Sequence, residues 1–152
     1  MISFTDVNVG DAIAERSFSA SNVSLFLYNA IIWNAHRIHY DEPYTQQVER
    51  HPAIVIDGPL QGDWLSQCAL NWAGDAADLV NFRYRNSTAA YLGETLITGG
   101  TVVEVDQSAR QVRVELFVKN QKGEVITPGE ATLRFSQSPN EPVAPGNTTA
   151  DS

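Results

Sequence analysis

This chain of 152 residues has a single cysteine, few basic residues and no long apolar run. The lone thiol, Cys68, cannot form an internal disulfide, which is typical of a protein from a reducing compartment. No stretch approaches the roughly 20 apolar residues that a membrane-spanning helix needs. The first residues, MISFTDVNVGD, carry acids where a secretory signal would carry basic and then apolar residues. We therefore expect a cytoplasmic protein.

The shortage of basic residues limits the partners that the chain is expected to bind. Ten Lys and Arg residues face 18 Asp and Glu residues, and the formal net charge is −8. This balance argues against nucleic acid or an anionic membrane as the main partner. It does not exclude a small anionic ligand, because Arg83 and Arg85 lie close together and could form a local basic rim for phosphates. The chain has no Gly-rich phosphate loop, Walker pattern or G-x-S-x-G motif, and we expect no cofactor.

The length suits one compact domain. Residues 136–152, SQSPNEPVAPGNTTADS, are rich in Pro, Ser, Asn and Thr and poor in large apolar side chains. Such a composition cannot bury enough apolar surface to fold. We predict a folded domain over residues 1–135 and a disordered tail over residues 136–152.

Two segments carry helical patterns. Residues 19–33, SASNVSLFLYNAIIW, predict a short amphipathic helix with Ser19 or Ser21 as its N-cap. Residues 57–77, DGPLQGDWLSQCALNWAGDAA, predict a second helix with Asp57 or Gly58 as its N-cap and Pro59 in its first turn. The apolar residues at helical spacing are Val23, Phe26, Leu27, Ala30 and Ile31 in the first helix, and Leu60, Trp64, Leu65, Cys68, Ala69 and Trp72 in the second. The wide apolar face of the second helix predicts that it is largely buried.

Strand patterns follow the second helix. They cover residues 79–85, 94–106, 110–120 and 129–136, and the sequence QKGE at residues 121–124 is a hairpin turn signal. In the first of these strands, alternation places Val80, Phe82 and Tyr84 on one face. A buried helix followed by a run of antiparallel strands indicates an α+β fold, with a curved sheet wrapped around one long helix.

The stretch WNAHRIHYDEPYTQQVERHPAIVIDGPLQG, residues 33–62, contains all three histidines. It resembles the hydratase motif of the MaoC-like dehydratase family, the (R)-specific enoyl-thioester hydratases with a hot-dog fold. The resemblance is strongest to the branch that contains mesaconyl-CoA hydratases and 3-hydroxyacyl-thioester dehydratases, whose pattern runs N-x-H-R-I-H-Y-D, then a Tyr, then H-G-P-L. It is dense over residues 33–65 and weaker over the strands up to Phe135.

Two positions depart from the patterns of this family. The better-known hydratase motif, G-D-x-N-P-x-H, has an Asp five residues before the catalytic His, and counting back from His39 gives Asn34. An Asn at this position is usual in the branch with the pattern N-x-H-R-I-H-Y-D. The other departure is Asp57, which stands where that branch has a His before the Gly-Pro step, and we expect it to bear on substrate choice.

The resemblance implies a hydratase or dehydratase acting on an acyl thioester, either acyl-CoA, which we favour, or a thioester of an acyl carrier. It assigns His39 as the group that takes and gives protons, because an imidazole can do both near neutral pH. Asn34 is expected to hold the water, and the N–H of Gly58, at a helix N-terminus, to stabilise the enolate oxygen. The residues expected to contact substrate are His36, Arg37, Tyr40, Asp57, Arg83 and Arg85.

Other interpretations of these residues stay open. The pair His36 and His39, with Arg37 and Asp41, could be a surface ion-pair and capping cluster, and the order H-x-x-H-x-D lacks a fourth partner for a metal, so we expect no metal. A hot-dog thioesterase would use an acid on the central helix, for which Asp63 is the candidate. A non-catalytic partner subunit is the third possibility. The resemblance also implies a homodimer, in which paired edge strands remove an exposed edge from each sheet.

Overall fold

The computed structural model describes residues 2–137. The helices and strands are β1 (Ala12–Ser19), α1 (Asn22–Ile31), α2 (Glu42–Gln47), α3 (Gly58–Ala73), β2 (Ala77–Tyr84), β3 (Thr95–Asp106), β4 (Gln111–Lys119) and β5 (Val125–Phe135), with short 3-10 turns at Phe4–Asp6, Arg37–His39 and Gly74–Ala76. The last strand ends at Phe135, while nearly all of the tail expected at residues 136–152 lies outside the described residues.

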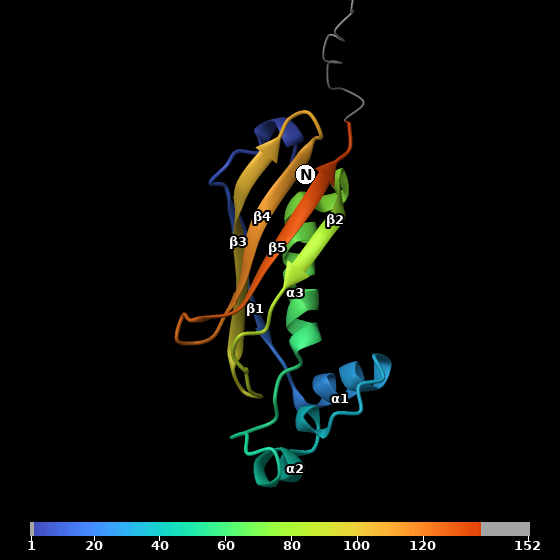
Figure 1. The fold of residues 1–152 in the computed structure, drawn as a ribbon, viewed down its shortest axis with the longest axis vertical. Helices are drawn as coiled ribbons and strands as arrows, with labels where there is room; N and C mark the ends of the chain where they lie inside the picture. The colour runs from blue at the N-terminus through green and yellow to red at the C-terminus, as the bar shows by residue number, and fades with distance from the viewer. Residues whose placement is uncertain (1, 138–152) are drawn as a thin grey trace, which may run out of the picture.

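One five-stranded antiparallel sheet, in the order β1-β3-β4-β5-β2, forms the body of the described part of the chain. Helix α3 runs along one face of this sheet and contacts every one of its strands (Figure 1). A sheet must curve around a helix for all its strands to reach it. This is the hot-dog architecture, and the fold expected from the sequence is confirmed.

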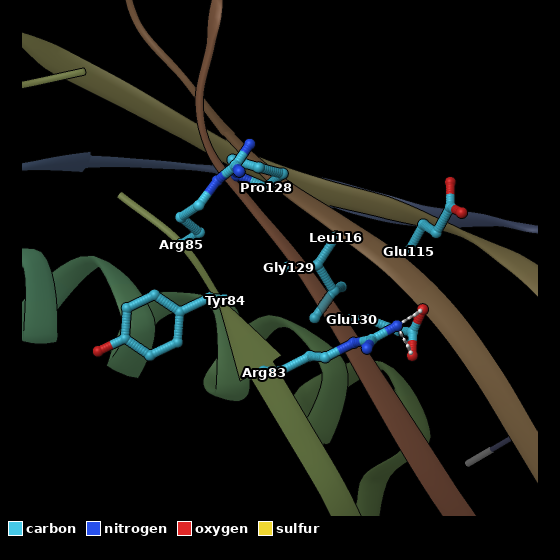
Figure 2. Close-up of a pocket in the computed structure, with 8 residues that line it drawn as sticks. All are labelled: Arg83, Tyr84, Arg85, Glu115, Leu116, Pro128, Gly129 and Glu130. Carbon is cyan, nitrogen blue, oxygen red and sulfur yellow. Dashed lines mark hydrogen bonds and ion pairs between the residues drawn. The ribbon is translucent and has the colours of Figure 1, made fainter. Parts of the chain in front are cut away.

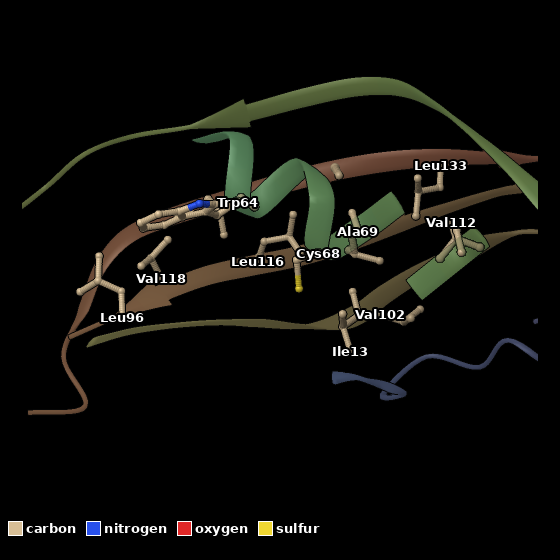
Figure 3. Packing of buried hydrophobic residues seen from close by; sticks show 14 of the residues in the cluster. Ile13, Trp64, Cys68, Ala69, Leu96, Val102, Val112, Leu116, Val118 and Leu133 are labelled. Carbon is tan, nitrogen blue, oxygen red and sulfur yellow. The ribbon is translucent and has the colours of Figure 1, made fainter. Parts of the chain in front are cut away.

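The core lies between α3 and the sheet. Trp64, Leu65, Cys68 and Ala69 of the helix are buried, as expected from its apolar face. They pack against alternating residues of the strands, among them Leu96, Val102, Val112, Leu116, Val118 and Leu133 (Figure 3). Burial raises the pKa of the Cys68 thiol, which keeps it protonated and unreactive.

A glycine allows the end of β2 to approach α3. A Cβ at Gly62 would overlap the ring of Tyr84, so this ring lies directly on the helix backbone. Because Gly62 is in the second turn of α3, this contact fixes β2 close to the end of the helix that carries Gly58.

Helix α1 is capped as the sequence predicts but is not buried as it predicts. Ser21 and Ser24 form a capping box, each side chain accepting from the backbone N–H of the other. The residues that α1 buries are Leu25 and Asn29, whereas the expected apolar face is largely exposed. The reason is position: α1 and α2 lie beyond the end of α3 and the sheet, so only a narrow strip of α1 meets the core (Figure 1).

Two strand features differ from the sequence-based expectation. The edge strand β1 was not predicted, because its central residues, AERS, are small or charged and lack the apolar alternation of a strand. In β2 the pairing with β5 shifts between Leu79 and Asn81. This bulge moves Val80 out of the expected row: Leu79 and Phe82 pack on the core, and Val80 is 39% exposed.

No helix in residues 2–137 is long and apolar enough to cross a membrane.

Removing buried volume from the centre of α3 is expected to destabilise the fold. Leu65 is fully buried and lies against Gly129 of β5, so Leu65→Ala should lower the free energy of unfolding by about 2 to 5 kcal/mol. Leu70→Ala is the matched control, because Leu70 lies on the same helix and is 38% exposed. Chemical denaturation measures both. Equal losses in the two variants would contradict the central position of this helix.

Candidate active site

The site lies at the N-terminal end of α3, where the segment after α1 folds back toward the helix (Figure 1). Backbone hydrogen bonds connect three loops there. The N–H of Val55 donates to the carbonyl of Ile38 at 3.0 Å, and the N–H of Ile56 donates to the carbonyl of Ala90 at 2.8 Å. These bonds place the turn Arg37–His39 beside the residues that enter α3.

His39 is held in one tautomer. Its side chain is buried, with the residue 7% exposed, and Nδ1 lies 2.8 Å from the carbonyl oxygen of Val55. A carbonyl oxygen can only accept, so Nδ1 carries the proton and Nε2 of the neutral ring keeps its lone pair. An imidazole fixed in this way presents a base at Nε2.

Asp57 faces this ring. Its Oδ1 lies 3.6 Å from Nε2 of His39, and the residue is fully buried. Two amides bind the carboxylate: Asn29 Nδ2 donates to Oδ2 at 3.0 Å and Asn34 Nδ2 donates to Oδ1 at 3.3 Å. Burial raises the pKa of the Asp57 carboxyl, although the imidazole and both amides oppose the shift. The burial of Asp57 differs from the substrate contact expected from the sequence.

A cavity of about 330 Å³ opens in front of His39 and the start of α3. Its polar lining includes Gly58, Gln61 and Asn86, and its other walls are Val55, Ile56 and residues 87–89. Gly58 is the first residue of α3, so its N–H has no acceptor within the helix and lies at the positive end of the helix dipole. The cavity therefore combines a base, a hydrogen-bond donor and room for a small ligand.

A buried polar network fixes one wall of this cavity. Asn86 Nδ2 donates to Thr127 Oγ1 at 3.1 Å, and this hydroxyl donates to Gln61 Oε1 at 2.6 Å. A Cβ at Gly58 would overlap the side-chain amide of Asn86. The space beside the Cα of Gly58, where a side chain would begin, is thus filled by Asn86.

His36 and Arg37 belong to a surface cluster. The His36 side chain is 51% exposed and lies 3.8 Å from Glu49, and its backbone N–H donates to Asn34 Oδ1. Arg37 binds Asp41 at 2.6 Å and stacks over the ring of Tyr44. The guanidinium of Arg37 lowers the pKa of the Asp41 carboxyl. His36 and Arg37 thus form surface ion pairs, as in the alternative interpretation of a surface ion-pair and capping cluster. Neither lines the cavity of His39.

Tyr40 lines a second hollow of about 350 Å³ together with Asn29 and Asn34. Phe26, Ala30, Trp33 and Ala35 complete its largely apolar lining. Trp33 is 93% exposed and has a φ of 58°, a left-handed conformation that is unfavourable for a large side chain.

Arg83 and Arg85 lie apart from His39. They line a third hollow of about 480 Å³ between β2, β4 and β5 (Figure 2). Arg83 is ion-paired with Glu130 at 3.0 Å, so its charge is already matched. Asn86, which follows Arg85 directly, is the residue that connects this segment to the cavity of His39.

The remaining candidates lie elsewhere. Asp63 lies on the exposed side of α3 and accepts a hydrogen bond from the Tyr28 hydroxyl at 2.8 Å. His51 has its Nδ1 3.3 Å from the Tyr91 hydroxyl, between two loops. Within residues 2–137, no three His, Cys, Asp or Glu side chains are grouped as metal ligands would be.

Sequence reasoning missed the residues that support the site. In the sequence, Asn29 is a polar residue in the middle of an apolar helix, which is a weak indication of a special role. In the structure it is buried, with 3% of its surface exposed. Gln61, also buried, lies one turn into α3 and carried no such indication. Asn86 and Thr127 come from a loop and a strand far along the chain, and only the fold brings them together.

The sequence profile of the hydroxyacyl-thioester dehydratase type 2 family matches residues 5–92, more than half of the chain. The chain belongs to this family. The match covers every residue of the His39 cavity, from the turn at Arg37–His39 to the loop at residues 86–89.

The chain is similar to curated proteins over parts of its length. Mesaconyl-C(4)-CoA hydratase of Chloroflexus aurantiacus is 37% identical over 67 residues, which are 44% of this chain and 23% of that protein. The mitochondrial hydroxyacyl-thioester dehydratase type 2 of Saccharomyces cerevisiae is 28% identical over 81 residues, 53% of this chain and 28% of that protein. The chain thus spans about a quarter of the length of the curated relatives it matches.

Two solved structures have the same fold. A MaoC-like dehydratase is 26% identical with a TM-score of 0.80, over 88% of this chain and 42% of that one. An R-hydratase from Pseudomonas aeruginosa is 22% identical with a TM-score of 0.78, over 94% of this chain and 96% of that one. The second likeness extends over the whole of both hot-dog units.

The contact between Gly58 and Asn86 predicts that alanine at position 58 is costly. Gly58→Ala should displace the Asn86 amide from Thr127 and lower the free energy of unfolding by about 1 to 3 kcal/mol. Thermal and chemical denaturation measure the loss. Adding Asn86→Ser, which removes the overlapping amide, should relieve the steric part of the loss, so the double variant should lose less than the sum of the two single changes. A Gly58→Ala protein as stable as the original would contradict this packing.

Proposed function

We propose that this chain is a hydratase/dehydratase that adds water to, or removes it from, an α,β-unsaturated acyl thioester, with CoA as the carrier. The observation that carries the proposal is that His39, whose Nε2 keeps its lone pair, and Gly58, the first residue of α3, line one cavity of about 330 Å³. Such a pair matches the two demands of the reaction, which are a proton carrier and a donor to the thioester oxygen. The family and the relatives named as hydratases support the same chemistry.

In the hydration direction, His39 Nε2 takes a proton from water as the water oxygen bonds to the β-carbon. The π electrons of the double bond move toward the carbonyl and give an enolate oxygen, which accepts a hydrogen bond from the N–H of Gly58. The enolate then collapses, and its α-carbon takes the proton from the imidazolium, so the ring returns to its neutral form. Water is consumed, nothing is oxidised or reduced, and dehydration is the same path in reverse.

The fixed tautomer matters for this path. Because the Val55 carbonyl holds the Nδ1 proton, only Nε2 exchanges a proton with water or substrate. The N–H of Gly58 is fixed by the helix and needs no rearrangement as charge develops, and loss of such a donor typically lowers kcat by roughly 10²- to 10³-fold. Asn34, which the motif resemblance assigns to holding the water, donates to Asp57 Oδ1 at 3.3 Å, and we propose that it acts through this contact.

The other substrate contacts are proposals of the same kind. The apolar hollow of Phe26, Trp33 and Tyr40 suits an acyl chain, and it lies next to the amides that hold Asp57. Arg85 of the third hollow is a candidate for a CoA phosphate, more so than the ion-paired Arg83. For the cellular location, the single thiol supports a reducing compartment, the cytoplasm.

The decisive test follows a panel of trans-2-enoyl-CoA substrates of different length and branching at the absorbance of the conjugated thioester. The wild-type chain should consume at least one of them without releasing free CoA thiol. Release of thiol would favour a thioesterase, and the exposed position of Asp63 argues against that outcome. An inert chain that co-purifies with a second hot-dog protein would favour the non-catalytic partner.

Replacing His39 should abolish turnover and leave the fold intact. His39→Gln keeps a polar side chain against Val55 and removes the proton carrier, and kcat should fall by roughly 10²- to 10⁴-fold. His51→Gln is the matched control and should retain activity, since the His51 ring lies against Tyr91 and does not line the cavity of His39. Steady-state kinetics with the best substrate measures both. Wild-type rates in His39→Gln would remove His39 from the mechanism.

We also propose that two copies pair through β2. Both β1 and β2 are edges of the sheet; the exposed residues of β1 are small or charged, whereas β2 exposes Val80 beside Asp78, Asn81 and Arg83. An unpaired edge strand with an exposed apolar residue is a template for strand pairing. The matched lengths support a functional assembly of two units, since this chain covers only 42% of the MaoC-like dehydratase chain.

A charge on β2 should therefore separate the copies. Sedimentation at micromolar concentration is expected to give twice the mass of one chain for the wild type and a single chain for Val80→Lys. Ala14→Lys adds the same charge to the other edge, β1, where Ala14 is exposed, and should leave the dimer intact. A monomeric wild type, or dissociation by Ala14→Lys alone, would contradict pairing through β2.

A further inference from the structure

The carboxylate of Asp57 occupies an unusual place. Asp57 is the N-cap residue of α3, where an Asp side chain normally accepts a hydrogen bond from the second or third N–H of the helix. No such bond forms here. The side chain turns away from the helix instead and lies fully buried, with Oδ1 3.6 Å from His39 Nε2.

We propose that Asp57 is the charge partner of His39: a positioning residue that stabilises the imidazolium formed when His39 takes a proton. It rests on the proposed function and adds the group that the motif of this chain otherwise lacks. The better-known motif supplies an acid five residues before the His, where this chain has Asn34. In this structure a carboxylate from another element, Asp57 at the start of α3, lies beside the imidazole of His39.

Asp57 acts through His39 and not on the substrate. It is fully buried and is absent from the lining of the cavity that His39 and Gly58 share. Its Oδ1 is too far from Nε2 for a hydrogen bond to the neutral ring but close enough for strong attraction to a charged one, especially in a buried site. The interaction therefore strengthens when the imidazole becomes charged, which is the state that the mechanism needs.

The two departures from the family patterns explain each other. Asn34 Nδ2 lies 3.3 Å from Asp57 Oδ1 and donates to it. An Asp at position 34 would place a second carboxylate at that distance, and two buried carboxylates cannot both ionise without a large cost. With Asp57 present, an amide at position 34 is the compatible partner, and Asn29 holds the other carboxylate oxygen in the same way.

The electrostatics argue against a stabilising role for Asp57. The titratable groups that face it are His39 and, from α1, Tyr28, while the His36 ring meets the His39 ring edge-on. Burial raises the pKa of the Asp57 carboxyl above its value in the unfolded chain, so folding favours its protonated form. Stability from this group is present below the unfolded pKa and is lost as pH rises through the folded pKa. At neutral pH the Asp57 carboxylate thus opposes folding.

The test compares Asp57→Asn with Asp63→Asn, which removes the same charge from an exposed position on α3. Asp57→Asn should lower kcat by on the order of 100-fold with little change in KM, and move the acidic limb of the pH–rate profile to lower pH. Its melting temperature at pH 7 should equal or exceed that of the wild type. Asp63→Asn should retain the rate and the profile. A lowered melting temperature with full activity per folded molecule would make Asp57 structural and overturn the proposal.

One further measurement keeps this test independent of the substrate. An NMR titration of the His39 ring should show its midpoint at lower pH in Asp57→Asn than in the wild type, whether or not the substrate has been found. Failure of the enoyl-CoA panel would thus count against the proposed function alone, while an unmoved midpoint would overturn the pairing. Asn34→Asp should lower activity, because it crowds Asp57 with a second carboxylate. An increase would show that the acid belongs at position 34.

Discussion

Helix α3 packs on the sheet along its whole length, and this packing decides where the helix begins. The first N–H groups of a helix have no acceptor within it, so their position in the fold is the position of a hydrogen-bond donor. Here the burial of Leu65 and Ala69 against the sheet fixes the helix, and Gly58 lies at its N-terminal end. The chain that precedes the helix must then cross this end, which brings His39 to it through the Val55 contacts. The donor and the base are neighbours because one helix is held in place.

Much of this arrangement could be predicted from local sequence. The apolar face of residues 60–72 predicts a buried helix, and Pro59 with Asp57 marks its start within one residue. Strand alternation locates β3 and β4 to within one residue at each end, since each has one buried face, whereas β5 begins at Val125, four residues before the expected start. The fourth, β2, was located in the chain, but a bulge reverses the side on which Val80 lies, and no local signal announces a bulge.

What sequence could not predict depends on contacts between distant segments. The apolar residues of α1 have helical spacing, but spacing does not tell whether anything lies against them, and the structure leaves Val23 and Ile31 exposed. Strand β1 forms because β3 offers it a partner and not because its own residues favour a strand. The site shows the same division. The motif identifies His39 and Gly58 from the sequence. The burial of Asp57, and the hydrogen bond that it accepts from Asn29, depend on the packing of α1 beside the start of α3.

The site holds polar groups that the fold alone would not require. Asp57 is buried without a full partner for its charge, and Asn29 Oδ1 has no hydrogen-bond partner among the described residues. Each such group opposes folding, and the apolar core beside them offsets the cost. Polar groups held in this way cannot rearrange when charge develops on the substrate, which is the condition for electrostatic catalysis.

The central claim is that one imidazole, His39, both removes the proton from water and delivers it to the α-carbon. A single group can serve only one face of the double bond, so the hydroxyl and the new hydrogen must add to the same face. Hydration of a trans-2-enoyl-CoA in D₂O, followed by NMR assignment of the product, measures this directly. The account predicts syn addition. Anti addition would require a second acid on the opposite face and would contradict it.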